Sequence, residues 1–184
     1  EKAQINKAIQ LYQSCAKQGG LQANFFLAIH YLQLKDHFQD FLTIQTDLNP
    51  TNGYYIKNPT RITIQPNHAK EVILALNYLS FIAEKGHILA ALYLYELYNP
   101  NNDPSQFPYI IGNEEKYRHY IELAANGNEF NALVLHVEYL IQHKKDTTDH
   151  AKQYQQRAIH ILKNYQYNPT TDNHPDQLEY INQS

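Results

Sequence analysis

Three short stretches of this chain share one pattern that ends in glycine: Cys15-Ala16-Lys17-Gln18-Gly19, Ile82-Ala83-Glu84-Lys85-Gly86 and Leu123-Ala124-Ala125-Asn126-Gly127. Counted from the last glycine, each copy has alanine three positions before it, leucine eight positions after it and tyrosine twelve positions after it. A repeat of this kind is one supersecondary unit, and it buries its apolar face only against neighbouring units. The repeat therefore favours a scaffold that binds another protein over an active site.

Helical periodicity lies on both sides of each aligned glycine. Apolar residues recur at three- and four-residue steps, and the prolines fall outside these periodic segments. We expect helices at about 3–18, 22–34, 68–85, 88–98, 114–126, 129–143 and 148–165. Each short break at a glycine joins two helices that fold back as an antiparallel pair. The predicted fold is all-α, a right-handed α-solenoid of stacked antiparallel helical hairpins in one domain spanning residues 1–184.

Two inserts interrupt the regular pattern. The first runs from about residue 35 to 66, and its residues are compatible with a further helix around 38–42 and with an extended stretch at 54–56 and 61–64. The second, from 99 to 112, is dense in Asn, Asp and Pro. Loops of this length are uncommon in compact domains and are often functional, so both inserts are candidates for partner contact.

Composition excludes several function classes. The formal net charge is −3, the pI is near 6.4 and no long basic run exists, which argues against nucleic-acid binding. The longest apolar stretches, such as 88–94, are too short to insert into a membrane. The chain begins at Glu1 and contains no methionine, so we expect an N-terminal part to be missing, whether a tag, a signal peptide or a lipoprotein leader. Cytoplasm and bacterial periplasm both fit, with the periplasm favoured.

Signals for catalysis or for a metal are poor. The single cysteine, Cys15, excludes an intrachain disulfide and is interpreted as a small core residue rather than as a nucleophile. No Gly-x-Ser-x-Gly motif and no Gly-rich phosphate loop exists. His136, His143 and His150 lie seven apart, but a helix break is expected at 144–148, and we interpret them as solvent-facing or loop residues. We therefore predict no catalytic residues, no metal, no cofactor and no enzymatic activity.

Tyrosine is the unusual residue, with sixteen copies and no tryptophan. Tyrosines in the repeat frame are interpreted as core residues: Tyr12, Tyr31, Tyr98, Tyr120 and Tyr139. Those outside the frame are better candidates for partner contact, because tyrosine offers a large contact area and a polar tip. The predicted partner-binding residues are Tyr54, Tyr55, Tyr93, Tyr95 and Tyr109, with Asn101 and Asp103 of the second insert. Ordinary surface or loop packing stays an equal alternative for each tyrosine.

The repeated residues resemble the Sel1-like repeat, a relative of the tetratricopeptide repeat. That family combines an alanine, an aromatic pair, an Ala-Ala-x-x-Gly step, a further alanine and a Leu-Gly-x-x-Tyr step. The matching residues are Ala8, Tyr12, Ala16, Gly19, Ala23, Leu27 and Tyr31, then Ala75, Tyr78, Ala83, Gly86, Ala90, Leu94 and Tyr98, then Tyr120, Ala124, Gly127, Ala132, Leu135 and Tyr139. The chain departs from the family where Ala28, Tyr95 and His136 replace the glycine after the leucine.

The resemblance implies a function in protein binding. The family includes bacterial adaptors, regulators and immunity proteins, and some members are partners of antibacterial phospholipase effectors. We therefore expect an immunity protein that binds and inhibits a secreted antibacterial effector, of the kind linked to type VI secretion. The alternative is an envelope adaptor or regulatory scaffold that assembles other proteins without inhibiting an enzyme.

Overall fold

The computed structural model of this chain describes residues 1–34, 64–143 and 149–164. Within these ranges the chain forms seven α-helices and no strand. The helices are α1 (Lys2–Lys17), α2 (Leu21–Leu32), α4 (Ala69–Ala83), α5 (Ile88–Tyr98), α6 (Glu114–Asn126), α7 (Phe130–Gln142) and α8 (Asp149–Asn164). The all-α prediction is confirmed for this part of the chain.

The predicted helices agree with the observed ones to within two residues at every end. Helices α5 and α6 begin and end at the predicted residues, because His87 and Asn113 cap their first turns. The Asn113 side chain accepts a hydrogen bond from the Lys116 backbone N–H at 2.9 Å. The helix expected at 38–42 and the extended stretch expected at 54–56 lie outside the described residues, as does the stretch expected at 61–64 apart from Ile64, which is buried.

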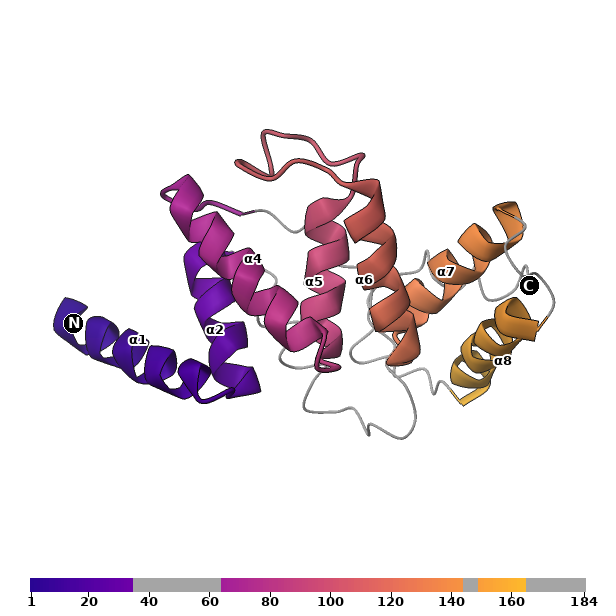
Figure 1. The fold of residues 1–184 in the computed structure, drawn as a ribbon, viewed down its shortest axis with the longest axis horizontal. Helices are drawn as coiled ribbons and strands as arrows, with labels where there is room; N and C mark the ends of the chain where they lie inside the picture. Colours follow the sequence, from indigo (N-terminus) through magenta and orange to yellow (C-terminus); the bar gives the residue numbers. More distant parts are fainter. Residues whose placement is uncertain (35–63, 144–148, 165–184) are drawn as a thin grey trace, which may run out of the picture.

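The helices lie side by side in the order of the chain, with α1 at one end of the row and α8 at the other (Figure 1). Extensive contact joins α1 with α2, α2 with α4, α4 with α5, α5 with α6, α6 with α7, and α7 with α8. Helices α1, α4 and α6 each precede a short turn and are here called the first helices. Helices α2, α5 and α7 follow those turns and are called the second helices.

Helix α5 is the centre of the core. Nine of its eleven residues are buried, and it lies between α4 and α6, with Glu96 as its one charged residue. Alanines let the helices approach closely, and Ala90 and Ala91 of α5 and Ala124 and Ala125 of α6 are all at most 1% exposed. The core is therefore continuous from α2 through α8.

Two of the three helix–helix turns have the same hydrogen bonds. The Gly19 N–H donates to the Ala16 carbonyl at 2.9 Å, and the Gly86 N–H donates to the Ala83 carbonyl at 3.0 Å. In both turns the next N–H reaches one residue further back, to Cys15 and Ile82. This is the Schellman motif, whose key residue adopts a left-handed conformation that favours glycine. The φ angles of Gly19 and Gly86 are +85° and +91°.

The third turn has the same motif one residue later than the sequence alignment predicts. Here the Asn128 N–H donates to the Ala125 carbonyl, and the Glu129 N–H donates to the Ala124 carbonyl, both at 3.0 Å. Asn128 has φ +63°, whereas Gly127 has φ −85°. Asn128, and not Gly127, is therefore equivalent to Gly19 and Gly86.

Gly127 has a different role. A Cβ atom at this position would lie 2.5 Å from Cγ1 of Ile88, whereas a Cβ at Gly86 would meet nothing within 4 Å. Gly127 is thus explained by the close approach of α6 to α5, and Gly86 by its backbone conformation. An alignment of the repeats on glycine alone therefore treats two positions with different structural roles as equivalent.

The corrected register makes the contacts between successive units equivalent. Tyr31 stacks on Tyr78 with ring centroids 6.2 Å apart and planes 4° apart. Tyr98 stacks on Tyr120 at 6.0 Å and 12°. In each pair the first tyrosine lies twelve residues after a turn residue, and the second lies eight residues before the next turn residue. The repeat is therefore visible in side-chain packing as well as in sequence.

The segment at 99–112 joins α5 to α6 as a closed loop. The Asn113 N–H donates to the Tyr98 carbonyl at 2.9 Å, and a Cβ on Gly112 would lie 2.6 Å from Cα of Pro100, so the two ends of the loop nearly touch. Phe107 is 7% exposed and belongs to the core. This compact shape, anchored by its own residues, is that of an Ω-loop.

The two roles of glycine can be separated by substitution. Gly86→Ala should lower the free energy of unfolding by about 1 kcal/mol, because alanine is strained at positive φ. Asn128→Gly should leave it unchanged or raise it, by up to about 0.5 kcal/mol. Gly127→Ala should also destabilise, but much less in an Ile88→Ala background, where the clash is removed. Denaturant unfolding measures all of these values, and a Gly127→Ala cost that is the same in both backgrounds would contradict the steric explanation.

Candidate functional site

Two of the predicted partner-binding tyrosines belong to the core. Tyr93 and Tyr95 are 1% and 2% exposed, since α5 is enclosed by α4 and α6. This corrects their interpretation as surface residues, because a buried side chain cannot contact a partner in this conformation. Tyr54 and Tyr55 lie outside the described residues.

The other three predicted residues lie on the exposed part of the 99–112 loop. Asn101 and Asp103 are exposed, and Tyr109 is 61% exposed. The Asp103 carboxylate accepts a hydrogen bond from the Ser105 N–H at 2.9 Å, and this bond holds the Asp103 pKa below its usual value. Ile111 is 87% exposed and was not predicted. The loop thus presents two large side chains, Tyr109 and Ile111, next to polar groups.

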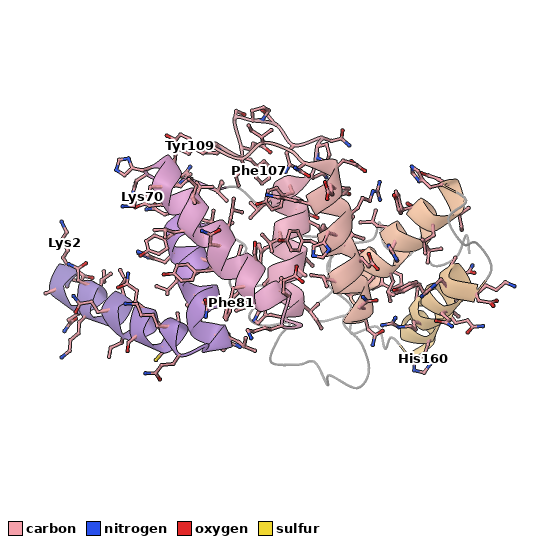
Figure 2. All side chains as sticks on the ribbon, viewed as in Figure 1. Lys2, Lys70, Phe81, Phe107, Tyr109 and His160 are labelled. Atoms are coloured by element: carbon pink, nitrogen blue, oxygen red, sulfur yellow. The ribbon has the colours of Figure 1, made fainter. Side chains whose placement is uncertain are left out.

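The exposed side of α4 provides further apolar surface. Ile73 is 60% exposed and Phe81 is 44% exposed. Their spacing of eight residues places both on the same half of the helix surface. The ammonium group of Lys85 lies 4.9 Å from the centroid of the Phe81 ring. In Figure 2 the loop carrying Tyr109 lies beyond the start of α4, and Phe81 lies near the other end of that helix.

The neighbouring side of α6 is polar. His119 Nε2 lies 2.5 Å from Glu84 Oε1, which links α6 to the residue that follows α4. Both side chains are about half exposed. Because imidazole carries charge only when protonated, this contact is an ion pair only in the acidic form of His119. The exposed surface of the first helices is therefore apolar over α4 and polar over α6.

A buried carboxyl group lies where α5 meets the start of α7. Glu129 is 0% exposed and caps α7, with its carboxyl oxygens accepting from the Ala132 N–H at 2.7 Å and the Asn131 N–H at 3.1 Å. The Tyr95 hydroxyl donates to the same group at 3.2 Å. Burial raises the pKa of Glu129 to about 7, against the opposing effect of these hydrogen bonds.

Sequence reasoning singled out Tyr95 but missed Glu129 for one reason. With Gly127 taken as the turn residue, Glu129 falls inside the predicted helix 129–143, where a glutamate is expected to face solvent. In the corrected register it is the cap residue that follows Asn128, at the position of Gly20 and His87. The His87 side chain also caps, accepting from the Ala90 N–H at 3.1 Å.

The histidines at 136, 143 and 150 differ from the prediction in one case. His136 is 8% exposed, and burial lowers its pKa. Its ring meets the Tyr154 ring of α8 edge-on, with centroids 4.7 Å apart. In the corrected register His136 takes the buried position of Leu27 and Leu94, which explains why it is not solvent-facing. His143 and His150 are exposed, as predicted.

The described residues contain neither a cluster of metal ligands nor a helix that could span a membrane. No group of three or more His, Cys, Asp or Glu side chains in residues 1–34, 64–143 and 149–164 is placed to hold a metal ion. None of the helices in the same ranges has the length and apolar character that crossing a bilayer requires. Cys15, expected in the core, is exposed on α1.

Glu129 should make stability depend on pH. Its carboxyl group keeps its proton in the folded state up to about pH 7, whereas its ordinary pKa is 4.5. The unfolded chain therefore releases this proton first, and stability should fall as pH rises from about 4.5 to about 7, by on the order of 3 kcal/mol. Glu129→Gln should remove that part of the pH profile, measured by denaturant unfolding at a series of pH values.

Glu138→Gln is the matched control, since Glu138 is exposed on the same helix. His136 contributes with the opposite sign, because a buried neutral histidine costs stability as pH falls. The informative quantity is thus the difference between the original chain and each variant. Identical profiles for the original chain and Glu129→Gln would contradict the raised pKa.

Comparisons of the chain with protein-family models, with curated proteins and with solved structures gave no match.

Proposed function

We propose that the hairpins form a right-handed α-solenoid and that this solenoid is a scaffold that holds another protein by binding, not by catalysis. Packing in chain order supports the solenoid, because stacked repeat units contact only their neighbours. The equivalent turns at Gly19, Gly86 and Asn128 support it as well. So do the two equivalent tyrosine stacks between successive units.

The observation that most supports binding is the closed loop that presents Tyr109 and Ile111. Both side chains are large and exposed, yet the loop that holds them is fixed by hydrogen bonds at its ends and by the buried Phe107. A surface that is ordered before binding loses little entropy when a partner arrives. Exposed aromatic and aliphatic side chains on such a surface are typical anchors of a protein interface.

The proposed partner is a secreted antibacterial effector, such as a phospholipase, and the chain is then its immunity protein. The Sel1-like resemblance supports this assignment. In this proposal Tyr109 and Ile111 contact the effector, and Asn101 and Asp103 form the polar rim around them. The exposed Ile73 and Phe81 of α4 extend the contact over the first helices.

The test is protection of bacterial cells against the effector encoded beside this chain. Cells that make the effector should survive when they also make the chain, with and without a periplasmic leader, and the protective form identifies the compartment. Tyr109→Ala combined with Ile111→Ala should weaken binding by at least about 2 kcal/mol, which is about thirtyfold in Kd. Ile141→Ala, at an exposed apolar residue of α7, is the matched control and should protect fully.

Equal death with and without the chain would contradict the immunity assignment. A stable complex that contains no toxic member would instead support the adaptor alternative. Full binding by the loop double variant, with loss of binding in the Ile141→Ala control, would place the interface elsewhere.

A further inference from the structure

Helix α1 has an apolar stripe that is largely exposed among the described residues. Ile5, Leu11 and Tyr12 are 52%, 61% and 41% exposed. Ala8 and Cys15 are exposed too, and the steps of three and four residues place all five side chains on one side of α1. We call these five residues the α1 stripe.

The α1 stripe occupies positions that are buried in the next first helix. Counted back from the turn residues Gly19 and Gly86, its members match five residues of α4: Val72, Ala75, Tyr78, Leu79 and Ile82. Four of these five α4 residues are at most 1% exposed, and the fifth, Tyr78, stacks on Tyr31 of α2. The α4 stripe is buried because α2, the second helix of the preceding hairpin, packs against α4.

Helix α6 repeats the arrangement. Its residues in the same register include Tyr117, Tyr120, Ile121 and Ala124. Tyr117 and Tyr120 contact Tyr95 and Tyr98 of α5, the preceding second helix. Ile121 and Ala124 are fully buried. In both α4 and α6, therefore, an α-helix covers the residues that are equivalent to the α1 stripe.

Helix α1 packs on its own hairpin partner through a few residues. Ala16 packs with Ala23 and Leu27 of α2, and Gln13 donates a hydrogen bond to the Tyr31 hydroxyl at 3.1 Å. The Tyr12 ring also contacts the Phe26 ring of α2, with centroids 5.6 Å apart. The α1 stripe itself lies on the side on which α4 and α6 each contact a preceding helix. This also explains why Cys15 is exposed although the equivalent Ile82 is buried.

We propose that the α1 stripe is the docking site for an amphipathic α-helix of a partner protein, which lies on α1 as α2 lies on α4. This inference rests on the proposed scaffold function and names a surface and a partner chemistry for it. The template predicts an aromatic side chain of the partner over Leu11, since the equivalent Tyr78 and Tyr120 each receive a tyrosine ring. A surface of this kind recognises apolar side chains of the bound helix that recur at three- and four-residue steps.

Charge adds a second property of the partner helix. Helix α1 contains three lysines, Lys2, Lys7 and Lys17, all exposed, and no acidic residue. Figure 2 shows Lys2 at the outer end of the helix. At helical spacing Lys2 and Lys7 flank the α1 stripe, whereas Lys17 lies on the opposite side. Acidic side chains at the edges of the partner helix would complement Lys2 and Lys7 and speed association. The partner helix is therefore apolar on one side and acidic at its margins.

The experiment uses the single thiol of the chain as the reporter. The probe is a synthetic peptide with the sequence of residues 21–34 and added glutamates at both ends. Because Cys15 lies in the stripe, bound peptide should slow its reaction with N-ethylmaleimide by about tenfold or more at saturation. An unchanged reaction rate at peptide concentrations that saturate anisotropy binding would overturn the proposal, as would the absence of binding.

Variants test the residues directly. Leu11→Glu and, separately, Ile5→Glu should each weaken the peptide by about tenfold or more, because each places a charge inside the contact. Gln10→Glu, on the exposed polar side of α1, is the matched control and should have less than about a twofold effect. Both stripe positions are exposed, so circular dichroism should show an intact fold; equal binding by all variants would overturn the proposal.

The remaining outcomes separate this inference from its alternatives. Sedimentation of the chain alone should show a monomer. A dimer in which Cys15 is protected, and which Leu11→Glu dissociates, would overturn the partner-helix proposal in favour of a second copy. The loop variants Tyr109→Ala and Ile111→Ala should leave peptide binding unchanged, so failure of the scaffold function and failure of the α1 site give different results.

Discussion

The packing of α5 between α4 and α6 is the interaction on which the rest of the structure depends. Nine of the eleven residues of α5 are apolar or aromatic and buried, so this helix would be unstable in contact with water. It is covered by α4 on one side and by α6 on the other. The alanines at the crossings bring the backbones close, and the tyrosines Tyr98 and Tyr120 stack where the helices separate. The first helices need be apolar only on their inner sides, which leaves their outer sides free to present Ile73 and Phe81. The loop between α5 and α6 is held in place by the same core through Phe107.

Much of the fold could be predicted from the sequence because its signals are local. Proline and glycine mark the ends of helices, and the three- and four-residue steps of apolar residues mark their inner sides, so helix bounds agree within two residues. The repeat alignment places the third turn one residue too early, because this chain requires glycine for two different reasons. At Gly86 the backbone requires it, and at Gly127 the side chain of Ile88 requires it. Only the three-dimensional structure distinguishes these two roles, since both positions are simply glycine in the sequence.

The candidate site could be predicted less well, because exposure depends on which helices lie alongside. Tyr93 and Tyr95 are predicted to contact a partner because they fall outside the repeat frame, yet both are at most 2% exposed. His136 is predicted to face solvent, and Glu129 carries no sequence signal, yet both are buried. Cys15 and Tyr12 fit the frame and are expected in the core, but in the described residues no helix lies beside α1 as α2 lies beside α4. The loop at 99–112 was located correctly, because its Asn, Asp and Pro content is itself a local signal.

The position of α1 at the end of the row has a consequence for how the molecule opens. In the described residues α1 makes extensive contact with α2 alone, whereas α5 is held from two sides. Where stability is a sum of nearest-neighbour terms, fraying starts at a terminal element and proceeds inward. Helix α1, with Ala16 as its only buried residue, is then an element of low local stability attached to the core that begins at α2. A molecule bound to α1 would suppress this fraying. Its stabilising effect would extend to α2 and no further, because the core around α5 is already stable.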